Sequence, residues 1–137
     1  MPHHLRVLLV DDDQTTNFLN KLLLTRLGVA EQVLVAANGE EALRILAQQG
    51  SEPATCPHLI LLDMNMPVLN GLAFLEAYTQ LPSAVQRAIV IVMLTTSLHP
   101  ADLARAGQLP IAGFLNKPLT EAKVAALLQD HFASPNP

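Results

Sequence analysis

The chain alternates between short runs of consecutive apolar residues and longer stretches with the spacing of amphipathic helices. The apolar runs are short, partly β-branched and apolar along most of their length, which favours strands buried on both faces. Five such runs are found: Leu5–Val10, Gln32–Ala36, His58–Leu62, Ala88–Leu94 and Ile111–Leu115. Each is therefore predicted to be a strand of a sheet covered on both sides.

Helices are predicted after each strand, because apolar residues there recur at three- and four-residue intervals. These positions are Phe18, Leu19, Leu22, Leu23 and Leu27 in the first helix, Ala42, Leu43, Leu46 and Ala47 in the second, Leu72, Leu75 and Tyr78 in the third, and Val124, Leu127 and Leu128 in the last. Between the last two, His99-Pro100-Ala101-Asp102 opens a short, weakly apolar fourth helix, with proline at a first helical position.

Residues that cap helices stand where these helices should begin and end. Asp13 and Asn38 are suited to the N-cap positions of the first two helices, and Gly28 follows the first helix at a position where glycine is favoured. Residues 50–57 predict a surface loop that enters the third strand.

The order of elements is strand then helix, five times over, which predicts an α/β fold with a parallel sheet and right-handed crossovers. No linker or internal repeat divides the chain, so residues 1–137 are expected to form one domain, with a core from about residue 5 to 132 and a frayed tail at 133–137.

Composition narrows the classes of function. The chain has 12 acidic and 8 basic residues, a net charge of −4, without a cluster of basic residues, which argues against direct nucleic-acid binding. No apolar run approaches the roughly 20 residues of a membrane span, so membrane insertion is not expected. The single cysteine, Cys56, cannot form a disulfide within the chain, and together with the absence of a signal-peptide pattern it favours a cytoplasmic location.

Polar residues follow four of the five predicted strands, and in a parallel sheet these strand ends lie along one edge, where ligands bind. The groups are Asp11-Asp12-Asp13, Asp63, Thr95-Thr96-Ser97 and Asn116-Lys117-Pro118. The second strand ends in Ala36-Ala37, which suits a peripheral position. Any one of these groups could serve only as a cap or a turn, but together they predict a site.

Carboxylates brought together resist ionisation unless a cation compensates their charge. Oxygen ligands without clustered cysteine or histidine favour a hard divalent ion, and Mg²⁺ suits a site with few carboxylates. With Lys117 to contact an anion, the site fits phosphoryl transfer, with Asp63 as the attacking group. The four aspartates and Lys117 together carry −3 of the net charge of −4.

The same segments resemble the receiver domain of two-component response regulators, in the right order. The resemblance rests on Leu8–Asp13, on Leu61–Pro67 with Asn70-Gly71, on Met93–Ser97 and on Gly113–Pro118, and it extends from about Arg6 to about Phe132. It implies a flavodoxin-like (βα)5 fold, doubly wound, with strand order 2-1-3-4-5. It also implies that a histidine kinase or a histidine phosphotransfer protein phosphorylates Asp63.

By this resemblance, Asp12 is a direct Mg²⁺ ligand and Asp11 holds water molecules on the metal. Asp63 is both the phosphoacceptor and a ligand, and Asn65 contributes its backbone carbonyl. Asp13 has no counterpart role in the family, which leaves it as a helix cap.

The resemblance also assigns the residues that respond to phosphorylation. Thr95 is the hydroxyl that moves toward the phosphoryl group, Lys117 is the cation that pairs with it, and Phe114 is the aromatic switch. Many members of the family have tyrosine at the switch position, so Phe114 must act by packing alone. The Lys117-Pro118 peptide bond is expected to be cis.

The leading hypothesis is therefore a stand-alone, Mg²⁺-dependent receiver in phosphorelay signalling, which promotes its own phosphorylation and dephosphorylation and turns over no separate substrate. Phosphorylation is expected to alter the face formed by the helix at His99–Asp102, the strand Ile111–Leu115 and the last helix. That face would bind an unidentified downstream protein and is also a candidate homodimer contact.

Three alternatives compete with this hypothesis. A phosphorylation-independent interaction module with the same fold is the main alternative. An aspartyl-nucleophile phosphatase usually needs a second carboxylate two residues after the nucleophile, where this chain has Asn65. A flavin-binding flavodoxin is disfavoured because the three aspartates after the first strand would repel the cofactor phosphate.

Overall fold

The computed structural model describes residues 4–49, 55–64, 71–95, 104, 108 and 111–132. The strands are β1 (Leu5–Val10), β2 (Ala30–Ala36), β3 (Leu59–Asp63), β4 (Val90–Thr95) and β5 (Gly113–Asn116). The helices with assigned bounds are α1 (Gln14–Arg26), α2 (Gly39–Gln49), α3 (Gly71–Tyr78), α4 (Ser83–Ala88) and α6 (Glu121–Phe132).

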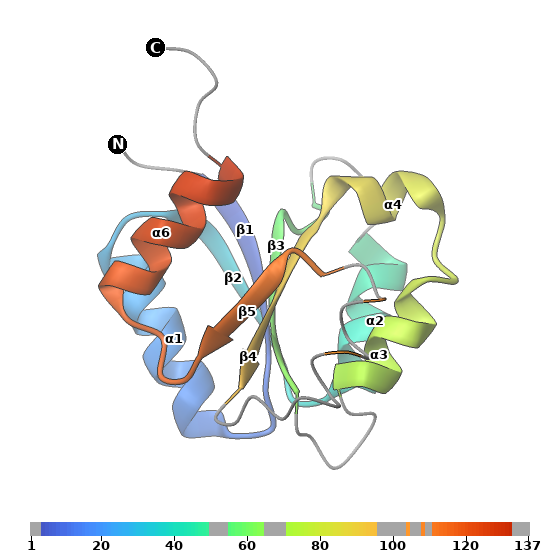
Figure 1. Cartoon of the computed structure of the whole chain (residues 1–137), viewed down its shortest axis with the longest axis horizontal. Coiled ribbons are helices and arrows are strands. Elements are labelled where there is room, and N and C mark those ends of the chain that lie inside the picture. The colour runs from blue at the N-terminus through green and yellow to red at the C-terminus, as the bar shows by residue number, and fades with distance from the viewer. Residues whose placement is uncertain are drawn as a thin grey trace.

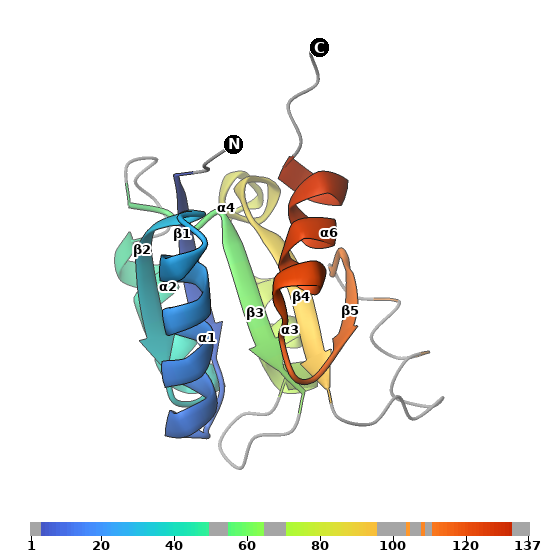
Figure 2. The same cartoon turned by 90° about the vertical axis from the view of Figure 1, so that its left-hand side faces the viewer.

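The five strands form one parallel sheet in the order β2-β1-β3-β4-β5. Helices α1 and α6 cover one face, and α2, α3 and α4 cover the other (Figures 1 and 2). The predicted fold class and strand order are confirmed, and so is the peripheral position of the second strand. Successive side chains of the central strands enter opposite layers: Leu8 and Ile60 pack with the α2–α3 side, whereas Leu9 and Leu61 pack with the α1–α6 side.

The bounds of β2, β3, β4 and β5 differ from the prediction by one or two residues, and β4 and β5 begin later than predicted because apolar runs continue across a change of structure. Ala88, expected to open a strand, is the last residue of the short helix α4, which the sequence pattern did not predict. Ile111 and Ala112 precede β5 and are not part of it. Val85 on α4 and Ile89 after it are both buried in the same core, so burial alone does not mark where the helix ends.

Helix α1 does not pack on the face that its apolar residues predict. Phe18, Leu19 and Leu22 are 65%, 54% and 49% exposed, whereas Asn17, Asn20 and Leu24 are buried. The Asn17 amide donates a hydrogen bond to the Asp11 carbonyl at 2.8 Å, which ties the first turn to the end of β1. The helix is confirmed, but the predicted apolar face is wrong for those three residues.

The predicted caps agree with the structure, and so do the apolar faces of α2, α3 and α6, except that Ala47 of α2 is exposed. Asp13 Oδ1 accepts from the Thr15 amide at 3.2 Å, Asn38 Oδ1 accepts from the Glu41 amide at 2.8 Å, and Gly28 has a φ of 71°. The apolar residues expected to pack on α3 and α6 are buried, namely Leu72, Leu75, Tyr78, Val124, Leu127 and Leu128. The helix expected at His99–Asp102 and the tail at 133–137 lie outside the described residues.

The segment that enters β3 is more buried than a surface loop. Cys56 and Pro57 are buried although Thr55 is exposed, so the prediction for residues 50–57 is wrong at its end, while residues 50–54 lie outside the described ranges. Arg6 Nε donates to the Cys56 carbonyl at 2.9 Å, and the Arg6 amide donates to His58 Nδ1 at 2.9 Å. Burial raises the pKa of the Cys56 thiol despite the opposing charge of Arg6.

Within the described ranges, no helix has the length and apolar character needed to cross a membrane.

Candidate functional site

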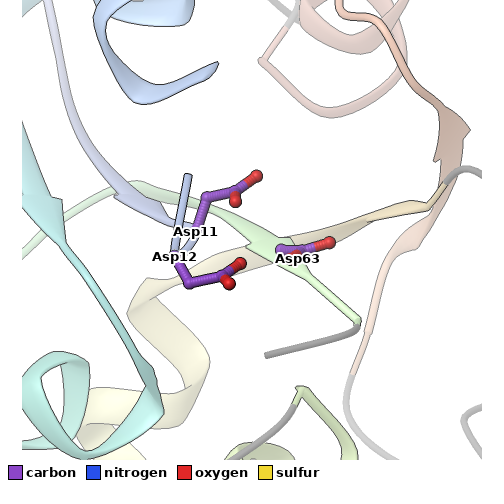
Figure 3. A group of neighbouring side chains, drawn as sticks. All are labelled: Asp11, Asp12 and Asp63. Carbon is purple, nitrogen blue, oxygen red and sulfur yellow. The ribbon is translucent and has the colours of Figure 1, made fainter. Parts of the chain in front are cut away.

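Three carboxylates meet where β1 and β3 end side by side. Val10 pairs with Leu62 in the parallel ladder, so Asp11 and Asp63 are neighbours at the same edge of the sheet. Asp11 and Asp63 are only 4% and 5% exposed, and Asp12 is exposed. One carboxylate oxygen from each of Asp11, Asp12 and Asp63 lies within 4.8 Å of the other two, and Figure 3 shows the side chains extending in the same direction.

Lys117, the residue that follows β5, joins this cluster. Its amide donates to the Thr95 carbonyl at 2.8 Å, which continues the pairing of β4 with β5 beyond Asn116. Its Nζ lies 2.8 Å from Asp11 Oδ2 and 3.0 Å from Asp63 Oδ1. Burial would lower the pKa of Lys117, but the hydrogen bonds and charges of Asp11 and Asp63 raise it above its usual value overall. Lys117 is therefore a fixed cation between the two buried carboxylates.

Backbone and side-chain hydrogen bonds hold Asp11 in place. Its amide donates to the Ala36 carbonyl at 3.1 Å, and its Oδ1 accepts from the Asp13 amide at 2.9 Å. Asp13 itself turns toward α1, where Oδ2 accepts from the Thr16 hydroxyl at 2.6 Å, and this bond is the main cause of a lowered pKa for Asp13. Asp13 is the N-cap of α1, which confirms its predicted capping role, and it is not part of the three-carboxylate group.

Thr95 and Phe114 lie on the strands next to the cluster. Asp63 pairs with Leu94, so Thr95 is one position further along β4, and its side chain is fully buried. Phe114 on β5 is partly buried and packs against the core on the α2–α3 side. The Lys117-Pro118 bond is cis, as predicted. Asn65, expected to offer its carbonyl to a metal, lies outside the described residues.

The charges and ligand atoms of the cluster fit a hard divalent cation. Three carboxylates carry three negative charges at full ionisation, and Lys117 compensates only one of them. All three groups offer oxygen, the ligand type that Mg²⁺ prefers. The exposed Asp12 gives the cluster an open side, as an ion that retains water molecules requires.

Two features near the site were not predicted from the sequence. A groove of about 250 Å³ runs between α1 and the segment after β5, and its lining includes Leu19, Asn20, Lys117 and Leu119. Lys123, on the first turn of α6, donates from Nζ to the carbonyls of Asn116 and Pro118. Both depend on contacts between segments far apart in sequence or on side-chain direction, which residue spacing does not reveal.

Comparison with known proteins identifies the type of domain. The family model of the response regulator receiver domain matches residues 7–129. The chain is 34% identical over 130 residues to the probable chemotaxis protein CheY of Rhizobium etli, covering 95% of this chain and 94% of that protein.

Solved structures agree with this result. A two-component response regulator from Cytophaga hutchinsonii has a TM-score of 0.84 at 27% identity, covering 93% of this chain and 97% of that one. A response regulator receiver protein from Dyadobacter fermentans has a TM-score of 0.79 at 30% identity, covering 94% of this chain and 98% of that one.

Proposed function

Because this chain belongs to the response regulator receiver domain family, we propose that it is a stand-alone receiver in phosphorelay signalling. In this proposal, Asp63 accepts a phosphoryl group from a histidine kinase or a histidine phosphotransfer protein. The observation that carries the proposal is the position of Asp63, buried at the end of β3 within 3.0 Å of Lys117 and grouped with Asp11 and Asp12.

In the reaction, the phosphoryl group passes from an oxygen or nitrogen atom of the donor to a carboxylate oxygen of Asp63. A carboxylate oxygen of Asp63 forms a bond to phosphorus while the bond from phosphorus to the donor atom breaks. With acetyl phosphate the electron pair leaves with acetate, and with a phosphohistidine it leaves with the imidazole nitrogen, which takes up a proton. The acyl phosphate returns to a carboxylate when water attacks phosphorus, the bond from phosphorus to the Asp63 oxygen breaks, and inorganic phosphate is released.

Asp11, Asp12, Asp63 and the carbonyl of Asn65 are the groups proposed to hold Mg²⁺. When bound, Mg²⁺ supplies positive charge beside the transferring phosphoryl oxygens. Lys117 supplies a second, fixed positive charge from this chain. Two carboxylates around Lys117 keep its ammonium in place before the phosphoryl group arrives, so little reorganisation is needed during transfer.

Phosphorylation is proposed to act as a switch through Thr95 and Phe114. A phosphoryl group adds about one and a half to two negative charges and three acceptor oxygens at neutral pH, which attract a nearby hydroxyl. Movement of Thr95 would empty space beside β4 and β5, and Phe114 would repack into it. The surface of β5, α6 and the helix expected at His99–Asp102 would then bind a downstream protein, or a second copy of this chain.

The direct test is incubation with Mg²⁺ and acetyl phosphate followed by intact mass measurement. We expect one added phosphoryl group, which is lost when EDTA replaces Mg²⁺ and in Asp63→Asn. Asp130→Asn, which removes an exposed aspartate on α6, is the matched control and should be phosphorylated like the wild type. No added group in the wild type, or a group that persists in Asp63→Asn, would overturn the proposal and favour a phosphorylation-independent interaction module.

A further inference from the structure

The first turn of α6 carries a lysine at a position where helices favour an acidic side chain. Thr120 is the N-cap, because its hydroxyl accepts from the Lys123 amide at 3.3 Å and its carbonyl accepts from the Val124 amide at 2.9 Å. Lys123 is therefore the third helical residue, where glutamate or glutamine completes a capping box. A positive charge here also opposes the helix dipole.

Helix α2 of the same protein shows the favoured arrangement. Asn38 caps that helix, and Glu41 stands at the position equivalent to Lys123. Glu41 Oε1 accepts from the Ala37 amide at 3.2 Å, so its side chain satisfies a donor at the start of the helix. Lys123 cannot accept such a bond, which means that local helix stability does not explain its presence in α6.

The Lys123 side chain instead contacts the segment that carries Lys117. Its Nζ donates to the Asn116 carbonyl at 2.7 Å and to the Pro118 carbonyl at 3.0 Å, the two carbonyls on either side of Lys117. On its other side, Lys117 is tied to β4 by the bond from its amide to the Thr95 carbonyl. The backbone of Lys117 is thus held from two directions, by β4 and by α6.

We propose that Lys123 is a positioning residue that keeps the Lys117 ammonium between Asp11 and Asp63. Lys117 has a long, flexible side chain, so the location of its backbone decides whether Nζ reaches both carboxylates. Asn116 and Pro118 are exposed, and water can replace Lys123 as the donor to their carbonyls. Loss of Lys123 therefore changes geometry much more than it changes the free energy of unfolding.

The phosphorylation readout of this inference rests on the proposed function, whereas a backbone readout does not. The test compares Lys123→Gln, Lys123→Arg, Lys21→Gln and the wild type. Glutamine suits the capping box but cannot carry the charge or reach of lysine. Lys21 is an exposed lysine of α1, so Lys21→Gln controls for the loss of one positive charge.

We expect Lys123→Gln to lower the rate of phosphorylation by acetyl phosphate at saturating Mg²⁺ by roughly 3- to 10-fold, less than the roughly 100-fold that a misplacement of about 1 Å can cost. Its thermal unfolding midpoint should be equal to or above that of the wild type. Lys123→Arg should recover most of the rate, and Lys21→Gln should match the wild type. Without any phosphodonor, amide exchange at Lys117 should be faster in Lys123→Gln, because the bond to Thr95 opens more often.

Each outcome decides the question. Wild-type rates and unchanged Lys117 exchange in Lys123→Gln would overturn the inference. An equal loss of rate in Lys21→Gln would assign the effect to net charge, and a lowered unfolding midpoint without recovery in Lys123→Arg would assign it to helix stability. If the wild type takes up no phosphoryl group, the proposed function fails, while the Lys117 exchange rate still tests the contact made by Lys123.

Discussion

Replacing Gly71 with alanine should disturb the phosphoacceptor strand directly. Gly71 is the first residue of α3, and its amide donates to the Met64 carbonyl at 3.0 Å. A Cβ at this position would lie 2.8 Å from the Asp63 carbonyl oxygen and 2.9 Å from Met64 Cα. Both are backbone atoms, so no side-chain rotation can relieve the overlap.

The size of the effect follows from this overlap. Ordinary contact begins at 3.4 Å, so α3 and the end of β3 must separate by about 0.6 Å. Overpacking of this kind costs about 1–3 kcal/mol, and the gain from alanine in a helix offsets at most about 1 kcal/mol. We expect a net loss of about 1–2 kcal/mol, which lowers the unfolding midpoint by roughly 3–10 °C in a domain of this size.

The assay pairs thermal unfolding, followed by circular dichroism, with the rate of phosphorylation by acetyl phosphate. Gly113→Ala is the matched control, since a Cβ at Gly113 meets no atom within 4 Å. We expect Gly71→Ala to lower both the midpoint and the rate, because the displaced backbone belongs to Asp63, and Gly113→Ala to lower neither. A Gly71→Ala protein as stable and as reactive as the wild type would refute the reasoning from backbone overlap.

Two further predictions concern stability. Phe74→Ala should lower the free energy of unfolding by about 3–5 kcal/mol, because Phe74 is fully buried and its ring stacks on Tyr78 with the ring centroids 6.0 Å apart. Phe18→Ala should change it by no more than about 0.5 kcal/mol, because Phe18 is 65% exposed. Similar denaturation midpoints for the two variants would contradict the assigned face of α1. Burial and the charge of Arg6 lower the pKa of His58 in the folded protein below its usual value of 6.5. Between that usual value and the lower folded pKa, the unfolded chain takes up a proton more readily than the folded protein does. The stability contributed by His58 is therefore fully present above about pH 6.5 and is lost as the pH falls from there toward the folded pKa. Urea denaturation at about pH 7.5 and pH 5.5 should therefore show a smaller loss of stability in His58→Gln than in the wild type, and an equal loss would exclude His58 as the cause.

Much of the site could be predicted because its residues occupy a simple position in the fold. Asp11 follows β1 and Asp63 ends β3, two strands that are apolar along most of their length, and parallel strands bring their carboxyl ends to one edge. Lys117 could be placed by the same reasoning, and its contacts with both aspartates agree with the prediction. The functional roles of these residues, and those of Thr95 and Phe114, stay predictions.

Other features could not be predicted because they depend on contacts that residue spacing does not encode. The apolar spacing of α1 indicates a helix but not the face that packs on the sheet. In the structure that face carries two buried asparagines, one of which, Asn17, donates to the Asp11 carbonyl, and it leaves Phe18 exposed. Cys56 is buried, and its carbonyl accepts a hydrogen bond from Arg6, which is 50 residues away in the sequence.

The amino-acid sequence by itself determined the strands, the capped helices and the set of acidic residues at one edge of the sheet. These features are local, since they depend on apolar runs, on the preferences of capping residues and on the direction of parallel strands. The tertiary structure decided which face of α1 packs on the sheet, how far β3 and α3 approach at Gly71, and where Lys123 places its charge. Those outcomes are set by the packing of whole elements against one another, in which the position of each side chain depends on residues distant in the sequence.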